Sequence, residues 1–352
     1  MPENKPQVFF FSNISSRKGV ANLIYGLTRD LTKAGNIYLV CCDADSADFS
    51  HLEDIIQRVN IFPLKRLLSL TPLRWDLKMM TFFEYNSFDY LASFYLKNAS
   101  PVYALAGMAL HIFKKAQRMG LKKILIATSL HIDYVWQLHK EEEKVVGADY
   151  EWLNLSLRDK ILKEYELADQ IIVHSDLTHN TFTDRGIPAS KLKRLNQKVD
   201  RDYFRRKEAK KDDIFRIIYV GRMTPQKGIH YLISAFKELK LANAELLLFG
   251  LTPTSRLKKW LNTQISEFPG ININQGDVRL AYEQASVLVH PSLNDNTGST
   301  IFEALGYGIP VILTENTGAK ELIKEGENGY IIPIRDVAAI KEKVLHYYNN
   351  LN

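Results

Sequence analysis

A polar loop and a short helix between two apolar runs, at residues 287–318, constrain this chain most. The first run, Val287 to Val289, ends at His290-Pro291, because proline cannot continue the hydrogen-bond ladder of a sheet. A helix is predicted from Ser299 to Leu305, followed directly by a second strand from Pro310 to Leu313. The stretch therefore predicts a strand–helix–strand unit of an α/β fold.

The loop of this unit has residues that suit a phosphate-bearing ligand. Gly298 lets a ligand approach the backbone closely, and the amides of Ser299 and Thr300 open the helix at its positive end. Glu303 lies about one turn into the helix, and its side chain tilts back toward that end, where it could accept hydrogen bonds from ribose hydroxyls. The alternative for these residues is an ordinary capped helix with a solvated glutamate.

This spaced set resembles the nucleotide-sugar-binding signature of retaining glycosyltransferases of the GT-B fold, family 4, also called glycosyl transferases group 1. The signature has two glutamates eight positions apart, a glycine three after the first, an alanine after the second, and then G-x-P. Glu303-Ala304, Gly298 and Gly308-Ile309-Pro310 match it, and Asp295 stands in place of the first glutamate. The resemblance implies two Rossmann-like α/β domains that face each other across a cleft.

A second motif resembles the diphosphate clamp of the same family. Arg222 and Lys227 form G-R-x4-K-G between a predicted strand, Arg216 to Val220, and a predicted helix, Ile229 to Leu239. Arginine offers a rigid fork of donors and lysine a mobile point charge, a pair that suits the two negative charges of a pyrophosphate. The alternative for two such cations is solvated surface.

The resemblance also implies the rest of the donor site. It extends the nucleotide-sugar contacts to Gly19, Gly250, Gly276, Val278, Gly298, Ser299 and Thr300. It assigns His131 and Asp295 to the transferred sugar and Glu303 to the ribose. His131 follows a buried strand, Lys123 to Thr128, at the carboxyl end where ligands collect in open α/β sheets. Asp295 is one methylene shorter than glutamate, which reduces its reach by about 1.5 Å.

Two other ligand classes have little support. Asp43-Ala44-Asp45 forms a D-x-D, which binds a metal in another glycosyltransferase fold, but three residues at a strand end are a weak signal. The family needs neither a metal nor a further cofactor, so we expect none. A nicotinamide-dependent oxidoreductase is disfavoured, because the first loop has only Gly19 and lacks G-x-G-x-x-G. We expect no nucleic acid partner.

The chain of 352 residues is long enough for two domains of ordinary size. We expect an acceptor-binding domain at 1–200, a basic linker at 201–211 and a nucleotide-sugar-binding domain at 212–352. Ile171 to His174 is predicted as the last strand of the first sheet, after Glu164, which opens the family's E-x-x-x-A-D. The predicted last helix, Val337 to Tyr348, ends near the C-terminus, where relatives usually continue into a crossover segment; we expect that segment to be short or missing.

The charge is concentrated in the first part of the chain. Residues 1–211 hold 32 basic and 25 acidic side chains, a net charge of +7, whereas residues 212–352 hold 14 and 15, a net charge of −1. This asymmetry indicates an anionic acceptor or an acidic membrane surface, with a solvated basic surface as the alternative. Residues 60–118, with a helix predicted from Ala104 to Ala116, interleave basic and aromatic side chains in a way that would suit peripheral membrane contact.

The expected location is the cytoplasm, with peripheral contact at the inner membrane face. Cys41 and Cys42 form no disulfide framework, which fits a reducing compartment, and the N-terminus lacks the pattern of a signal peptide.

The function that we predict is sugar transfer with retention of configuration, from a UDP- or GDP-linked donor, in polysaccharide or glycoconjugate biosynthesis. The acceptor would be a glycan, a lipid-linked glycan or a small molecule. Two alternatives stay open on the same fold: a sugar-nucleotide epimerase or hydrolase, and a non-catalytic subunit that partners an active transferase. Nucleotide release without an acceptor would indicate the first, and weak or absent nucleotide binding the second.

Overall fold

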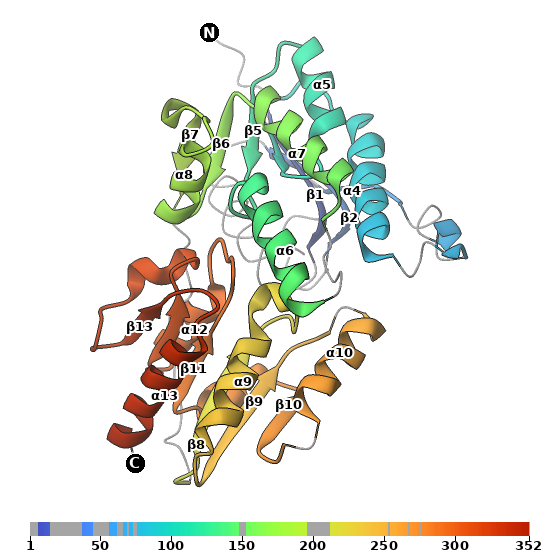
Figure 1. The fold of residues 1–352 in the computed structure, drawn as a ribbon. Coiled ribbons are helices and arrows are strands. Elements are labelled where there is room, and N and C mark those ends of the chain that lie inside the picture. Colours follow the sequence, from blue (N-terminus) through green and yellow to red (C-terminus); the bar gives the residue numbers. More distant parts are fainter. Residues whose placement is uncertain are drawn as a thin grey trace. The chain divides into compact units, whose positions relative to one another are not determined.

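The structure is a computed structural model that describes residues 6–14, 37–44, 56–61, 66–68, 70–72, 76–147, 153–195, 212–252, 254–266, 268–274 and 276–351. The predicted linker at 201–211 and Gly19 lie outside these residues. The chain divides into two compact units, one formed by Met1–Trp136 with Glu151–Gln197 and the other by Gln137–Tyr150 with Lys198–Asn352. We call them the first and the second unit; Figure 1 labels their elements.

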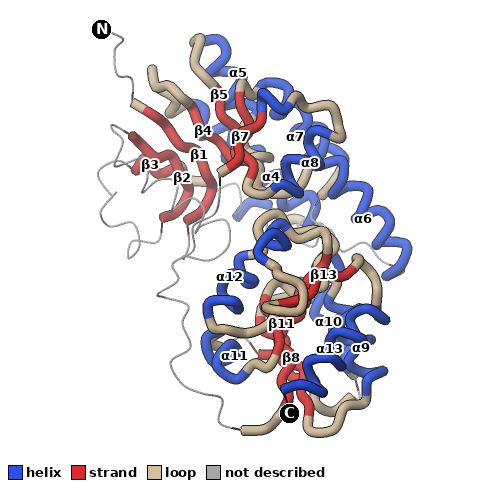
Figure 2. The backbone as a smooth tube through the Cα atoms, turned by 90° about the vertical axis from the view of Figure 1, so that its left-hand side faces the viewer, coloured by secondary structure: helices blue, strands red, loops and turns tan. Residues whose placement is uncertain are grey.

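The first unit is built on a seven-stranded parallel sheet with the order β3-β2-β1-β4-β5-β6-β7. Its strands are β1 (Gln7–Ile14), β2 (Ile37–Ala44), β3 (Ile56–Arg58), β4 (Val102–Leu105), β5 (Lys123–Ile126), β6 (Gln170–Val173) and β7 (Leu192–Arg194). Its described helices are α4 (Leu77–Ser93), α5 (Leu110–Arg118), the start of α6 (Ile132–Val146), α7 (Leu155–Leu167), α8 (Asp176–Thr183) and the 3₁₀ turn η3 (Ala189–Lys191). Figure 2 shows α4, α5, α7 and α8 on one side of this sheet.

Both faces of the first sheet are apolar. Val8 and Phe10 of β1 pack into the core beneath the helices, whereas Phe9 and Phe11 join a second buried cluster on the opposite face. Side chains alternate between the faces of a strand, so a continuous apolar run indicates a strand that is covered on both sides, as in parallel sheets.

The second unit has a six-stranded parallel sheet with the order β10-β9-β8-β11-β12-β13. Its strands are β8 (Phe215–Val220), β9 (Ala244–Phe249), β10 (Ile271–Asn274), β11 (Val287–His290), β12 (Val311–Thr314) and β13 (Gly329–Ile332). Its helices are α9 (Ile229–Leu239), α10 (Ser255–Ile265), α11 (Val278–Gln284), α12 (Ser299–Gly306) and α13 (Val337–Leu351), with the 3₁₀ turns η4 (Pro225–Lys227) and η5 (Gly318–Leu322).

Helices cover both faces of the second sheet. The buried cluster on one face takes side chains from α9, α10 and α13, and the cluster on the other takes them from α11 and α12; Figure 2 shows the two groups on opposite sides of β8 and β11. The chain runs outward from β8 to β10 and then returns to place β11 on the other side of β8. In such doubly wound sheets, ligands bind at the carboxyl ends of the strands beside this reversal.

The predicted α/β architecture with two doubly wound sheets is confirmed, but two elements of the first unit differ from the prediction. The helix expected over Ala104–Ala116 is β4 followed by α5, because Gly107, at φ +94°, ends the strand and turns the chain. The strand at Ile171–His174 is not the last of its sheet, since β7 pairs with it in parallel.

Two buried carboxylates explain why α5 begins where it does. Glu164 of α7 accepts hydrogen bonds from the amides of Ala109 and Leu110 at 2.9 and 3.1 Å, and Asp89 of α4 accepts from those of the next two residues. Lys160 lies between the two acids, with Nζ 2.5 Å from Asp89 Oδ2 and 3.9 Å from Glu164 Oε1. Burial nevertheless raises the pKa of Glu164 to about 7. The glutamate of the E-x-x-x-A-D motif therefore has a structural role in this unit.

Another buried carboxylate organises the second unit. Glu142, on the half of α6 that belongs to this unit, is only 1% exposed. It accepts a hydrogen bond from Arg335 Nε at 2.9 Å and from the Tyr231 hydroxyl at 3.1 Å, and His230 Nε2 lies 2.7 Å from its other side. Burial alone would raise the pKa of Glu142, but His230 and Arg335 outweigh it and hold that pKa below its usual value.

Candidate nucleotide-sugar site

The candidate site lies at the carboxyl edge of the second sheet, where two pairs of loops approach each other closely. Gly250, after β9, has φ +146°, and a Cβ atom there would lie 1.9 Å from the Gly221 carbonyl oxygen after β8. Gly228, at the start of α9, has φ +66°, and a Cβ atom there would lie 1.9 Å from the Pro291 carbonyl oxygen after β11. Only glycine fits at these positions, so the loops after β8, β9 and β11 are held against one another.

Lys227 and Asp295 join two of these loops. Lys227 Nζ lies 2.7 Å from Asp295 Oδ2, and His290 Nε2, at the end of β11, lies 3.0 Å from the same oxygen. The other oxygen accepts hydrogen bonds from the amides of Thr297 and Gly298 at 3.3 and 3.0 Å. Burial by itself would raise the pKa of Asp295, but the ammonium of Lys227 and the contact with His290 outweigh it, and the pKa lies well below the usual range.

This geometry bears on the expected role of Asp295. Both carboxylate oxygens are engaged within the protein, one with Lys227 and His290 and the other with backbone amides. In this structure Asp295 therefore orders the loop before α12 and holds the clamp lysine, and its contact with a sugar stays a prediction.

Arg222 differs from Lys227 in its surroundings. Its side chain is exposed, and it forms no hydrogen bond or ion pair with any residue that the structure describes. Its carbonyl oxygen accepts a hydrogen bond of 2.6 Å from the Tyr219 hydroxyl, which fixes the turn after β8. The guanidinium is therefore available to a ligand at the same edge of the sheet.

The start of α12 has the features of an anion site. Gly298 takes the left-handed conformation, at φ +63°, and precedes the first helical residue, Ser299, without a side-chain cap. The Thr300 hydroxyl is buried and has no hydrogen-bond partner among the described residues, and the same holds for the Thr224 hydroxyl in the clamp loop. Buried hydroxyls are usually hydrogen-bonded, so these two are exceptions, one in the loop of Arg222 and Lys227 and one in the first turn of α12.

Glu303 lies on the next turn of α12. Its Oε2 accepts a hydrogen bond of 2.8 Å from the hydroxyl of Tyr282, a buried residue of α11. Burial is the main cause that raises the pKa of Tyr282 well above 10, and the neighbouring Glu303 carboxylate adds to it. The phenol therefore keeps its proton and acts as the donor. The tyrosine ring stacks on Tyr307, with centroids 5.2 Å apart.

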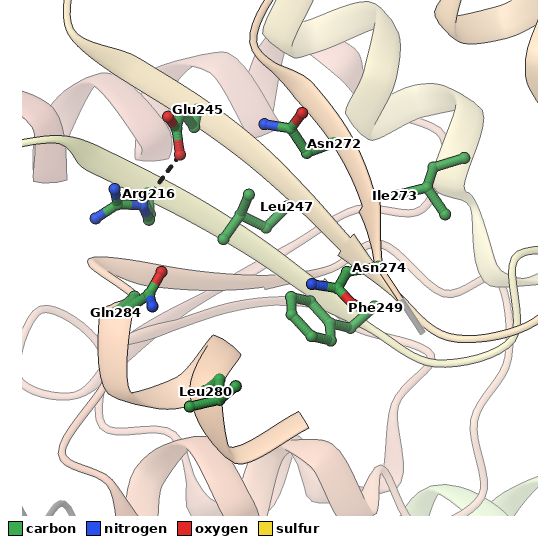
Figure 3. A pocket seen from close by; sticks show the side chains of 9 residues that line it. All are labelled: Arg216, Glu245, Leu247, Phe249, Asn272, Ile273, Asn274, Leu280 and Gln284. Carbon is green, nitrogen blue, oxygen red and sulfur yellow. Dashed lines mark hydrogen bonds and ion pairs between the residues drawn. The ribbon is translucent and has the colours of Figure 1, made fainter. Parts of the chain in front are cut away.

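The segment expected to bind the base adjoins a shallow pocket of about 260 Å³ (Figure 3). Asn274 Oδ1 accepts the Gly276 amide at 2.7 Å, so that amide is already engaged, and Val278 is the first residue of α11. The pocket is lined by Arg216, Glu245, Leu247, Phe249, Asn272, Ile273, Asn274, Leu280 and Gln284. None of the clamp residues lines it, and Arg216 forms an ion pair with Glu245 at 3.0 Å. The pocket is therefore separate from the clamp.

His131 lies in the first unit and is 3% exposed. Its ring packs against Tyr165 and Phe182, with centroids 5.1 and 5.0 Å apart, and Nδ1 accepts the Asp133 amide at 3.3 Å. Burial lowers its pKa to about 4, so it is neutral near pH 7. These contacts give His131 a packing and helix-capping role, and its assignment to the sugar stays a prediction.

Metal ligation has no support in the described part of the chain. No group of three or more histidine, cysteine, aspartate or glutamate side chains is placed there to hold a metal ion. Of the D-x-D motif, Asp43 lies at the end of β2 and Asp45 lies outside the described residues.

Sequence reasoning did not identify His290, Tyr282 or Thr224 as parts of the site. His290 ends β11, Tyr282 reaches Glu303 from 21 positions away, and Thr224 lies between Arg222 and Lys227. A signal existed for His290, since a polar side chain that ends an apolar strand lies at the carboxyl edge of its sheet. Tyr282 had no comparable signal, because a tyrosine in a short helix usually packs into the core.

The second part of the chain matches a known protein family. Residues 200–351 match the model of the family described as glycosyl transferases group 1. The capsular polysaccharide biosynthesis glycosyltransferase CapM of Staphylococcus aureus is 27% identical over 301 residues, which cover 83% of this chain and 76% of CapM. The putative colanic acid biosynthesis glycosyltransferase WcaL of Salmonella typhimurium is 26% identical over 52% of this chain and 48% of its own length, so the match spans about half of WcaL.

Two solved structures share the fold along nearly the whole chain. Anabaena Alr3699/HepE, in complex with UDP and glucose, has a TM-score of 0.69 and 18% identity, over 99% of this chain and 90% of its own. Sucrose-phosphate synthase from Thermosynechococcus elongatus has a TM-score of 0.73 and 16% identity, over 98% of this chain and 90% of its own. The chain as a whole therefore has the GT-B fold, and residues 200–351 are similar to the glycosyl transferases group 1 family.

Proposed function

We propose that this protein is a retaining glycosyltransferase that moves a sugar from a nucleotide-sugar donor to an acceptor in polysaccharide or glycoconjugate biosynthesis. One observation carries the proposal: Asp295 holds the Lys227 ammonium at 2.7 Å with one oxygen and accepts the Gly298 amide before α12 with the other. The clamp lysine and the positive end of a helix are thereby fixed together at the carboxyl edge of the sheet.

The chemistry of the transfer requires charge stabilisation at this edge. When the bond between the sugar and the donor phosphate breaks, negative charge develops on the leaving diphosphate. Lys227 and Arg222 would neutralise that charge, and the first amides of α12 would donate to the phosphate oxygens. Such groups are effective because they are already oriented before the bond breaks.

The contacts to the ribose and the base would come from the same edge of the sheet. Glu303 would accept hydrogen bonds from the ribose, and the backbone near Val278 would contact the base. We propose a UDP-linked donor ahead of a GDP-linked one, because the fold neighbour HepE is described in complex with UDP and with UDP-glucose. A polysaccharide intermediate is the preferred acceptor, because the relatives CapM and WcaL are named for capsular polysaccharide and colanic acid biosynthesis.

Peripheral membrane contact of the first unit belongs to this proposal. Leu67, Leu70, Tyr90 and Phe94 are each at least 50% exposed, and the first unit holds 23 basic and 18 acidic side chains, a net charge of +5. None of the helices in the described part of the chain is long and apolar enough to span a membrane. Co-sedimentation with vesicles of phosphatidylglycerol, lost at high salt and in Leu70→Glu, would support surface contact; equal recovery with neutral vesicles would contradict it.

A nucleotide titration with EDTA tests the donor assignment. We expect UDP to raise the melting temperature, because a ligand at about 100 times its dissociation constant stabilises the folded state by about 2.7 kcal/mol. The shift should persist in EDTA. Incubation with UDP-sugars, with and without membrane extract as the acceptor source, then separates transfer from hydrolysis. Sugar release without acceptor would favour the hydrolase or epimerase, and no binding of UDP, GDP or ADP would favour the non-catalytic subunit.

A further inference from the structure

The hydrogen bond between Tyr282 and Glu303 joins the two parts of the site that would bind the nucleoside. Tyr282 belongs to α11, which starts at Val278 directly after the segment expected to bind the base. Glu303 belongs to α12, whose first turn would bind the phosphates. The donor and acceptor are 21 positions apart in the sequence and 2.8 Å apart in the structure. This one hydrogen bond therefore links α11, which would adjoin the base, to α12, which would adjoin the phosphates.

The tyrosine is held rigidly on its side of this contact. Its side chain is fully buried, and its ring stacks on Tyr307, which follows the last turn of α12. Tyr307 in turn donates its amide to the Glu303 carbonyl at 3.1 Å. A buried, stacked ring has few alternative rotamers, so its hydroxyl presents a fixed donor to the carboxylate.

The Glu303 side chain is less deeply buried than the tyrosine. Glu303 is half-buried, and the last torsion of a glutamate side chain has a broad energy minimum. A carboxylate that must accept hydrogen bonds from a pair of ribose hydroxyls needs a defined rotation about that torsion. A hydrogen-bond donor held in a fixed position against one carboxylate oxygen restricts this rotation, because it favours one orientation of the carboxylate plane.

We propose that Tyr282 is a positioning residue that orients the Glu303 carboxylate for the ribose and thereby makes the site selective for ribonucleotide over deoxyribonucleotide donors. This inference rests on the proposed function, since it assigns a role within the same nucleotide site. Tyr282 itself does not contact the ligand in this assignment; it acts through Glu303.

The experiment compares Tyr282→Phe with the wild type by calorimetric titration of UDP, 2′-deoxy-UDP and 3′-deoxy-UDP. Phenylalanine keeps the buried ring and its stacking, and removes only the hydroxyl. We expect Tyr282→Phe to bind UDP about 3- to 10-fold more weakly, less than the loss of a direct contact to a charged group because Tyr282 acts only through Glu303, and to bind at least one of the deoxy analogues almost as well as the wild type does. The preference for ribose should therefore shrink.

Tyr348→Phe is the matched control. This tyrosine lies in α13 of the same unit, and its hydroxyl donates to the Ala242 carbonyl oxygen at 3.0 Å, a contact that involves no site residue. The control variant should keep the ribose preference of the wild type. Glu303→Ala, made alone and with Tyr282→Phe, gives a second readout: the tyrosine substitution should have little further effect on the ribose preference once the acceptor of its hydrogen bond is gone.

The possible results separate the inference from the proposed function. Equal weakening of all three ligands in Tyr282→Phe would mean that the tyrosine matters only for packing, and an unchanged ribose preference would mean that it does not orient Glu303; either result overturns the inference alone. Additive effects of the two substitutions would also overturn it. A wild-type protein that binds none of the ligands would overturn the proposed function together with this inference.

Discussion

Lys227 and Asp295 form an ion pair that joins the turn before α9 to the loop before α12, with Nζ 2.7 Å from Oδ2. The lysine and aspartate side chains are only 14% and 17% exposed, so the pair is largely removed from water. The close packing of Gly228 against Pro291 brings the two loops together and so places the two side chains within reach of each other. The lysine therefore has a fixed position before any diphosphate arrives.

Asp295→Ala should destabilise the second unit by about 2–4 kcal/mol. The substitution leaves a largely buried ammonium without its partner and removes the acceptor of the Gly298 amide. Asp295→Asn should cost less, because its carbonyl oxygen can still accept from that amide. Urea unfolding at pH 7 measures both. A loss below about 0.5 kcal/mol in the alanine variant would show that the aspartate does not organise this loop.

Arg222→Met should weaken nucleotide binding without changing stability. The guanidinium is exposed and has no partner among the described residues, so its removal leaves no buried group unsatisfied. Loss of a charge-assisted contact to a diphosphate corresponds to about 1.5–3 kcal/mol, or roughly a 10- to 150-fold weaker affinity. Titration calorimetry with UDP and thermal unfolding measure the two effects separately.

Lys259→Met is the control for that variant. Lys259 is also exposed, on α10, and its replacement removes the same charge from the second unit. If both variants weaken UDP binding equally, the effect comes from net charge and Arg222 is no part of the clamp.

The residues that the sequence predicted well are those whose structure depends on local pattern. The bounds of α9 agree with the predicted Ile229–Leu239, because its apolar side chains recur with the helical period between a glycine and a left-handed Lys240. The strands β8, β11 and β12 were predicted to within one residue at each end, since buried parallel strands are short apolar runs bounded by polar turns.

The contacts that give the site its geometry could not be predicted from local pattern. Asp295 finds Lys227 from 68 positions away, and Glu164 finds the start of α5 from 55 positions away. Neither separation along the chain produces a recognisable sequence pattern, because the fold of the sheet brings the partners together, and not a helix or a turn. The helix predicted over Ala104–Ala116 was wrong for the same reason: its apolar residues suit a helix locally, but β4 pairs with β1 and β5.

As the pH falls from 7 to 5, Glu164, whose pKa burial raises to about 7, should stabilise the first unit, whereas His131 should destabilise it. Burial lowers its pKa to about 4, below the 6.5 of an exposed histidine. The unfolded chain therefore binds the proton first as the pH falls. The contribution of His131 to the unfolding free energy is fully present above pH 6.5, and it is lost progressively toward pH 4. This one group accounts for about 1–2 kcal/mol between pH 7 and pH 5.

His131→Asn isolates that contribution. The asparagine oxygen can replace Nδ1 as the acceptor of the Asp133 amide, but it does not titrate. The variant should therefore show a smaller loss of unfolding free energy from pH 7 to pH 5, measured by urea titration at both pH values. The same pH dependence in variant and wild type would place the titrating group elsewhere, for instance at His174, whose pKa burial also lowers to about 4.

Arg335→Met should destabilise the second unit by about 2–4 kcal/mol, and far more than a comparable change at an exposed ion pair. Arg335 donates to Glu142 at 2.9 Å and to Glu141 at 3.0 Å, and Glu142 is 1% exposed. Removal of the arginine leaves a buried carboxylate with less compensation, the case in which breaking an ion pair is most costly. Urea unfolding at pH 7 measures the loss.

Lys341→Met provides the comparison, because Lys341 lies 2.7 Å from Glu238 in a pair whose side chains are 33% and 53% exposed. That pair should contribute less than about 1 kcal/mol, since solvent screens it. Glu142→Gln combined with Arg335→Met should recover part of the lost stability, because the neutral amide no longer needs a cation. If the double variant is as unstable as the sum of the two single variants, the arginine acts through packing and not through the charge of Glu142.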